Sequence, residues 1–169
     1  MRTSELWCAV QCDPTLRRHV MGVYARNTLP SSIPWLLRAR GVGFIVNTEP
    51  RQKRGRHWIA MVIEGNKAEL FDSLAEPVNV DFDRYLKSRV ASYIYNRQQL
   101  QSVDSDICGL YCLYYLLHKF KNSLSLNQIV HHFNPYDLLW NDDVVSRSMC
   151  RYFKYCTHCT SLSTNGCSS

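Results

Sequence analysis

The stretch HWIAMVIEGNKAELFD, residues 57–72, decides the fold that this sequence predicts. Its first part, 57–63, is an apolar run that ends at Glu64-Gly65-Asn66, and its second part, 67–72, alternates polar and apolar residues. Apolar runs bounded by turn residues are typical of strands, and a Gly-Asn pair between two such runs is typical of a hairpin. We therefore predict an antiparallel hairpin that begins at His57 and ends at Asp72.

Segments on either side of the hairpin extend this pattern. Before it, Phe44–Val46 is a short apolar run that we predict to be a further strand. After it, apolar residues at spacings of three and four predict amphipathic helices. These helices are predicted over residues 81–95, 108–120, 126–133 and 142–155. Strands that precede helices in a block, without alternating with them, indicate the α+β class.

Length and composition predict an ordered domain. Of 169 residues, 46% are hydrophobic and 20% are charged, which excludes a disordered chain. We expect a single domain over 1–155 and a mobile tail, rich in Ser, Thr and Cys, over 156–169. Neither a secretory signal nor an apolar run of the ~20 residues needed to span a membrane is visible. We therefore expect a protein of the cytoplasm, the nucleus or a particle, not a secreted one.

Eight cysteines in 169 residues fall below the roughly 8–10% that marks a disulfide scaffold, so we expect reduced thiols. The tail contains the Cys156–Cys159 motif Cys-Thr-His-Cys, with Cys150 and Cys167 nearby. A Cys-x-x-Cys pair can bind zinc, but a single pair is a weak signal. The sequence therefore favours a reduced tail and no metal site.

A histidine and an acid lie at the two ends of the hairpin. The midpoint between His57 and Asp72 falls at Glu64-Gly65, so a turn there would place the two residues nearly opposite each other on one face. A carboxylate in that position accepts the imidazole N–H and fixes its tautomer. A surface ion pair or a structural histidine is the alternative that this spacing leaves open.

Cys108 directly precedes the clearest helical pattern, and Asp104, Ser105 and Asp106 offer N-cap side chains before it. At a helix N-terminus the unpaired N–H groups favour the thiolate. Gln101 is close enough in sequence for its amide, together with the Cys108 N–H, to bind an oxyanion. A buried, inert cysteine and a solvated glutamine are the alternatives.

Five motifs carry a resemblance to a known family. In chain order they are Ile45-Val46-Asn47-Thr48, His57-Trp58, Leu70-Phe71-Asp72, Gln101-Ser102-Val103 and Cys108-Gly109-Leu110-Tyr111-Cys112. Their order and the spacing from Gln101 to Cys108 resemble the adenovirus protease (adenain) family. The order His, acid, Gln, Cys is shared with SUMO and ubiquitin-like proteases. The resemblance implies a papain-like permuted cysteine-protease core, with a central, mostly antiparallel sheet and flanking helices.

The resemblance also implies roles for single residues. It assigns the nucleophile to Cys108, the general base to His57, the orienting acid to Asp72 and the oxyanion donor to Gln101. Trp58 is similar to the aromatic residue beside the catalytic histidine. The adenovirus enzymes usually have Glu at the position of Asp72, whereas the SUMO proteases have Asp. Where they have a cysteine that tethers an activating peptide, this chain has Val90, so any such peptide would bind noncovalently.

The activity that the resemblance implies is that of a cysteine endopeptidase without a metal or organic cofactor. It would cleave viral or virus-derived structural precursor proteins next to small residues such as Gly during particle maturation, in the virion or the host cell. Two alternatives stay open. One is a protease that removes SUMO or ubiquitin-like modifiers, and the other is a catalytically silent, nucleic-acid-binding particle protein.

Positive charge gathers directly before His57. The chain has a formal net charge of +6, and the segment 51–56 contains Arg51, Lys53, Arg54 and Arg56. Such a segment attracts phosphates. Together with the resemblance, it predicts DNA as a partner, whereas a solvated surface loop is the alternative.

Overall fold

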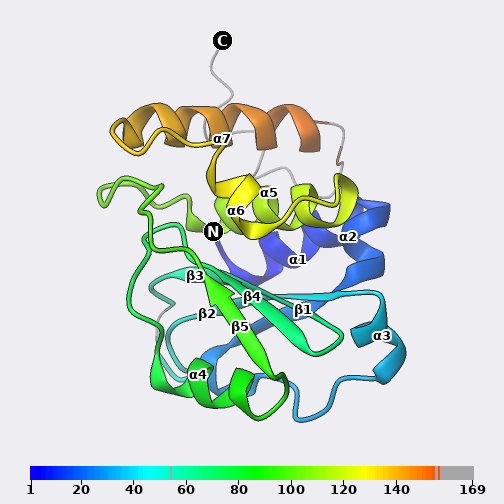
Figure 1. The fold of residues 1–169 in the computed structure, drawn as a ribbon. Helices are drawn as coiled ribbons and strands as arrows, with labels where there is room; N and C mark the ends of the chain where they lie inside the picture. Colours follow the sequence, from blue (N-terminus) through cyan, green and yellow to red (C-terminus); the bar gives the residue numbers. More distant parts are fainter. Residues whose placement is uncertain (54, 155, 157–169) are drawn as a thin grey trace.

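The computed structural model describes residues 1–53, 55–154 and 156. Seven helices, one short 3-10 helix and five strands lie in these residues (Figure 1). In chain order the elements are α1 (Thr3–Cys12), α2 (Pro14–His19), β1 (Val20–Ala25), η1 (Arg26–Thr28), α3 (Trp35–Ala39), β2 (Val42–Asn47), β3 (Trp58–Glu64), β4 (Lys67–Phe71), α4 (Val80–Lys87), β5 (Ser92–Tyr95), α5 (Cys108–Lys121), α6 (Leu126–Val130) and α7 (Leu138–Phe153). The predicted α+β class is confirmed.

The five strands form one sheet in the order β1-β2-β3-β4-β5. The inner pairs β2–β3 and β3–β4 are antiparallel, and the outer pairs β1–β2 and β4–β5 are parallel. The sheet is therefore mixed, whereas a mostly antiparallel one was predicted. The physical reason is that helix-containing crossovers, with α3 before β2 and α4 before β5, return the chain in the same direction, as parallel pairing requires.

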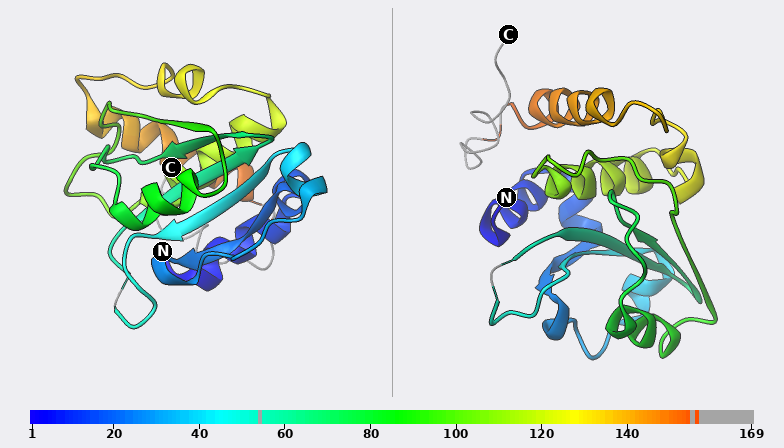
Figure 2. Two further views of the ribbon diagram at one scale, coloured as in Figure 1. Left: turned by 60° about the horizontal axis from the view of Figure 1, so that its bottom comes forward. Right: turned by 90° about the vertical axis from the view of Figure 1, so that its left-hand side faces the viewer.

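Helices cover both faces of the sheet. Figure 2 shows α5 and α7 in layers on one side of the strands and α4 on the other. One cluster of buried side chains joins Ile45, Ala60 and Val62 of the sheet to the helices around α5. A second cluster joins the alternate residues of the same strands to Phe82 and Leu86 of α4. Because both faces are buried, β2 and β3 contain nearly unbroken apolar runs.

The helix predicted over 81–95 is half wrong. Its first part is α4, but Ser92–Tyr95 form β5, which pairs in parallel with β4. Apolar spacing in this segment fits both structures, and the run Tyr93-Ile94-Tyr95 of aromatic and β-branched residues favours the strand. The helix predicted over 108–120 is confirmed as α5. The two later helices are α6, which is shorter than predicted, and α7, which begins earlier at the cap Asp137.

The end of α1 and the chain after α7 lie next to each other. Cys12 at the end of α1 and Cys156 after α7 form a disulfide, so the expectation of reduced thiols does not hold in the structure for this pair. Their proximity results from packing between elements that are 144 residues apart in sequence, which no local pattern encodes. The remainder of the predicted tail, 157–169, lies outside the described residues, and the division into a domain and a mobile tail stays a prediction. None of the helices in the described part of the chain is long and apolar enough to span a membrane.

Candidate active site

His57 and Asp72 form a buried pair. His57 Nε2 donates to Asp72 Oδ1 at 2.6 Å, and each residue is only 4% exposed. The carboxylate also accepts from two backbone N–H groups, with Leu74 N at 2.9 Å from Oδ1 and Glu76 N at 3.2 Å from Oδ2. The surface ion pair that the sequence left open is therefore excluded. Because Nε2 faces the acid, Nδ1 is the ring nitrogen available to a second partner.

The hairpin places this pair differently from the sequence prediction. The turn is Gly65-Asn66, because Glu64 pairs with Lys67. Gly65 lies in the left-handed region at φ 55°, which glycine adopts without strain. By this register Asp72 is opposite Ile59, so His57 lies two residues further along the same face. The pair is thus diagonal across the ladder, a separation that a histidine and an aspartate side chain can span.

Cys108 completes the group as the first residue of α5. It is 6% exposed, and its thiol hydrogen-bonds with the His57 side chain. The N-cap of α5 is Ile107, and no side chain caps it, so the predicted capping by Asp104, Ser105 or Asp106 is wrong. Without a side-chain cap, the first N–H groups of the helix stay directed toward the space in front of Cys108.

The surroundings of His57 favour its charged form. Burial alone lowers the pKa of His57, but hydrogen bonds to Asp72 and Cys108 and the charges of both residues outweigh burial and raise it from 6.5 to about 10. At neutral pH the ring is therefore an imidazolium that lies between Asp72 and Cys108. A cysteine beside an imidazolium is the arrangement in which a thiol can become a nucleophile.

Cys112 lies one helical turn after Cys108 and differs from it in chemistry. It is 1% exposed, and burial, followed by the nearby Cys108 and Asp72 charges, raises its pKa well above the ordinary value. It stays a thiol within the core. Of the two cysteines, only Cys108 contacts the histidine.

Gln101 lies in the loop before α5, 1% exposed. Ser73 Oγ donates to its Oε1 at 2.6 Å, and its Nε2 donates to the carbonyl and hydroxyl oxygens of Ser105 at 2.8 and 3.0 Å. The solvated glutamine that the sequence left open is therefore excluded. The Ser105 carbonyl can only accept, so the bond to it identifies the amide nitrogen as the end that faces the loop leading into Cys108.

The structure adds polar residues that the sequence analysis missed. Asn96 holds the backbone of Asp72 from both sides, with Asp72 N donating to its Oδ1 at 2.8 Å and its Nδ2 donating to Asp72 O at 2.6 Å. Asp142 on α7 accepts from Tyr111 OH at 2.8 Å and from Ser102 N at 3.3 Å, and it hydrogen-bonds with Ser105. Asn96 thus joins the start of the loop that carries Gln101 to Asp72, and Asp142 joins the end of this loop to α5 and α7.

Trp58 packs in the core behind the pair, 7% exposed, and its Nε1 donates to Met1 O at 3.1 Å. A Cβ added at Gly109 would lie 2.9 Å from Met1 Sδ and 3.1 Å from a methyl group of Leu6. The start of the chain therefore packs tightly against the residues that follow His57 and Cys108.

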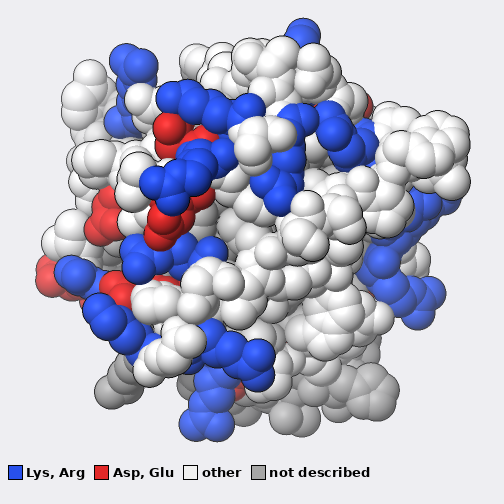
Figure 3. All heavy atoms as spheres, turned by 90° about the horizontal axis from the view of Figure 1, so that it is seen from below, with Lys and Arg blue, Asp and Glu red and all other residues white. Residues whose placement is uncertain are grey.

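The basic segment before His57 connects β2 and β3. Arg51, Lys53 and Arg56 are exposed, whereas Arg54 lies outside the described residues. Lys53 Nζ lies 3.8 Å from Glu49 in an exposed ion pair, which adds little stability. Figure 3 shows that Lys and Arg atoms gather in several groups on one face of the molecule, some of them with Asp and Glu atoms among them.

Comparison with known proteins gives two curated relatives, whereas no protein-family model matches. The protease of bovine adenovirus 4 is 30% identical over 108 residues, covering 53% of this chain and 54% of the relative. The protease of bovine adenovirus 7 is 27% identical over 103 residues, covering 49% and 50%. The chain thus spans about half the length of the curated relatives it matches.

Two solved structures are also similar. The central domain of the Lpg1148 protein from Legionella pneumophila covers 96% of this chain and 97% of its own, with a TM-score of 0.51 and 15% identity. The match to the pS273R protease of ASFV covers 54% of this chain and 38% of the protease, with a TM-score of 0.43 and 19% identity. At 15% identity, the similarity to the Lpg1148 domain shows a shared fold and nothing more. The two sequence matches confirm the predicted resemblance: over about half of its length, this chain is similar to the adenovirus proteases.

Proposed function

We propose that this chain is a cysteine endopeptidase in which Cys108 is the nucleophile, His57 the general base and acid, and Asp72 the residue that orients His57. The observation that carries the proposal is the buried imidazole that hydrogen-bonds with a carboxylate on one side and with a cysteine at a helix N-terminus on the other. A structural histidine would not require both partners. The similarity to adenovirus proteases supports the same reaction.

The proposed mechanism follows from these contacts. The Cys108 thiolate attacks the carbonyl carbon of the scissile peptide bond, and the His57 imidazolium then gives its proton to the leaving amine. In the second half of the reaction, the neutral imidazole takes a proton from water, which hydrolyses the thioester. Asp72 keeps the ring in one tautomer throughout, because its carboxylate can only accept from Nε2.

For the oxyanion, we assign the backbone N–H of Cys108 and the side-chain amide of Gln101. The first N–H groups of a helix have no acceptor within it, so that of Cys108 is available to a substrate oxygen. Gln101 Nε2 has two N–H bonds, both of which now face Ser105. To serve in the oxyanion hole, one of these N–H bonds must turn away from Ser105 and donate to the oxyanion when substrate binds. Catalytic hydrogen bonds often form fully only in the substrate-bound or transition state.

As substrates, we propose viral or virus-derived structural precursor proteins cut after small residues such as Gly, in the virion or the infected cell. An activating peptide, if this chain uses one, would bind noncovalently. Val90 supports this part of the proposal, because it is 7% exposed and packs in the cluster under α4, where no tether could attach.

Cleavage specificity gives the test of this function. We expect the chain, incubated with a mixture of peptides from a digested proteome, to generate new termini that follow Gly, as mass spectrometry would detect. Alkylation with iodoacetamide should stop the reaction, because the thiolate is the nucleophile. Cleavage that persists after complete alkylation of Cys108 would contradict the proposal. Release of a tag only from SUMO or ubiquitin Gly-Gly fusions would instead assign the chain to the deconjugating proteases.

We also propose that DNA binds at the exposed segment 51–56, since Arg51, Lys53 and Arg56 project from the connection that leads directly into His57. Each phosphate contact releases counterions, so the logarithm of affinity should fall with the logarithm of salt concentration by about 0.9 per contact. Changing these three residues to Ser should reduce the slope by up to about 2.7. Fluorescence anisotropy with mixed-sequence duplexes measures both slopes. A variant at Arg84 and Lys87 of α4, which are exposed elsewhere, is the matched control, and an unchanged slope in the first variant would remove this segment from the DNA interface.

A further inference from the structure

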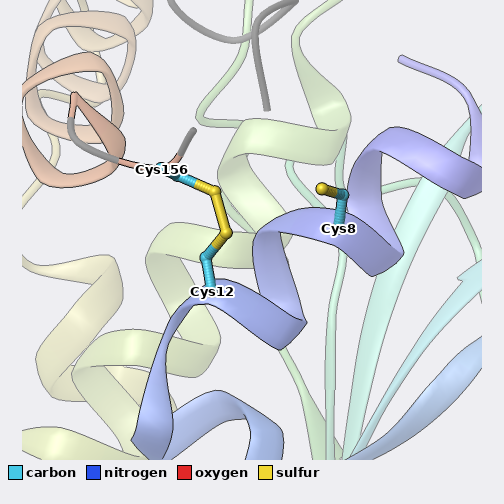
Figure 4. A group of neighbouring side chains, drawn as sticks. All are labelled: Cys8, Cys12 and Cys156. Atoms are coloured by element: carbon cyan, nitrogen blue, oxygen red, sulfur yellow. A yellow bond between two sulfur atoms is a disulfide. The ribbon is translucent and has the colours of Figure 1, made fainter. Parts of the chain in front are cut away.

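Three cysteine sulfurs lie together at the junction of the two chain ends. The Sγ atoms of Cys8, Cys12 and Cys156 are all within 4.8 Å of one another. Figure 4 shows Cys8 and Cys12 on successive turns of α1, with the Cys8 sulfur directed to the side where Cys12 and Cys156 are joined. All three residues are half-buried and pack against the core around α5. None of them belongs to the proposed active site.

The fold holds these residues near each other without relying on their sulfurs. Cys8 and Cys12 are four residues apart on one helix, so their side chains share a face. Next to them, Tyr152 OH donates to Asp13 Oδ2 at 2.5 Å, and Lys121 Nζ donates to Tyr152 OH at 2.8 Å. These bonds connect α7 and α5 to the residue that follows Cys12. The chain after α7 is thereby brought back to α1 even when the cysteines are reduced.

From this geometry we infer that the reduced protein binds one Zn²⁺ through the thiolates of Cys8, Cys12 and Cys156. A tetrahedral zinc site with Zn–S bonds of about 2.3 Å places its sulfurs about 3.8 Å apart. The Cys8 sulfur already lies within 4.8 Å of the other two, and the Cys12 and Cys156 sulfurs can separate to this distance once a phosphine or thiol reductant has supplied the two electrons that cleave their disulfide. Each thiol loses its proton on binding. The fourth tetrahedral position is open to water.

A metal accounts for this cluster better than a disulfide alone. A disulfide uses only Cys12 and Cys156, whereas a metal would also use the sulfur of Cys8, which lies beside them. Thiolate ligands in a tetrahedral arrangement favour zinc among the common divalent ions. The sequence analysis considered zinc only for the tail motif, because the contribution of α1 depends on tertiary packing.

The zinc would fix α1 against α5, the helix that begins with Cys108. Met1 and Leu6, at the other end of this region, fill the space beside Gly109, and Met1 O accepts from Trp58 Nε1. Tying α1 to the chain after α7 therefore stabilises the packing behind Cys108 and His57. We expect the role to be structural, since the active-site contacts do not include these sulfurs.

The test begins with the full chain expressed in zinc-supplemented medium and purified in a phosphine reductant. Elemental analysis should find about one zinc per chain, and removal of the metal with a strong chelator should lower Tm by about 5 °C or more. After exchange with Co²⁺, the sulfur-to-cobalt charge-transfer band should lose about a third of its intensity with each of Cys8→Ser, Cys12→Ser and Cys156→Ser. The matched control is Cys112→Ser, which should keep both the metal and the full band.

Three results would overturn the inference. One is a fully reduced chain that holds no zinc, and another is a Cys8→Ser variant that holds as much as the wild type. The third is iron or copper in place of zinc in the purified chain. Circular dichroism identifies any variant that fails to fold, and the chelation experiment on the wild-type chain needs no substitution.

Discussion

Replacing Cys108 by Ala is expected to abolish peptide cleavage, lowering kcat/KM by at least about a thousandfold. The reason is that the proposed reaction passes through a thioester on this sulfur, and the alanine side chain offers no atom that could form one. The fold should persist, because removing a single sulfur from a small buried side chain costs about 1 kcal/mol. Steady-state kinetics on a Gly-containing peptide, together with thermal unfolding, measure the two effects separately.

Cys112→Ala is the matched control for this experiment. Both cysteines are buried, and both lie on the first two turns of α5, so the two variants lose the same atoms from the same helix. Only Cys108 contacts His57, and the Cys112 variant should keep its activity within a few-fold. If the Cys108 variant retained more than about a tenth of wild-type kcat/KM, the nucleophile would have to be another residue.

The sequence predicted the active-site hairpin because the information there is local. A Gly-Asn pair between two apolar runs defines a turn, and the face shared by His57 and Asp72 follows from strand periodicity. The exact pairing register of β3 with β4 could not be predicted from this local pattern. With the turn at Gly65-Asn66, the pair is diagonal, whereas a turn one residue earlier would make it directly opposite. Only the ladder as a whole decides between the two.

The supporting residues could not be predicted, because each acts across the fold. Asn96 hydrogen-bonds with the backbone of Asp72, and Asp142, on a helix 40 residues later in the sequence, accepts a hydrogen bond from Ser102 N. No spacing rule connects them to the site. The same holds for β5, whose four residues fit a helical pattern until β4 is present as a partner. The side chains that we propose as catalytic lie in motifs that were visible in the sequence, whereas the residues that hold them were not predicted.

His57→Ala should lower kcat/KM by about a thousandfold or more, because the thiolate loses its counterion and the leaving amine loses its proton donor.

The pH dependence of wild-type activity should depend on the charge of the His57 ring. Its pKa is raised to about 10, so activity should hold through neutral pH and fall as pH rises through about 10, where the imidazolium is lost. The matching contribution to the free energy of unfolding is fully present below pH 6.5 and disappears over the same rise, since the folded pKa is above the unfolded one.

Asp72→Asn separates this role from simple loss of the base. The amide keeps the shape of the carboxylate but removes its charge, which is one of the causes that raise the His57 pKa. The alkaline limb of the profile should therefore move to lower pH, and kcat/KM at pH 7 should fall by less than in His57→Ala. Profiles of kcat/KM between pH 5 and 11, recorded for both enzymes with unfolding curves as a check on the fold, measure this shift. A limb that stays in place in the variant would mean that Asp72 does not set the protonation of His57, and that another group orients the ring.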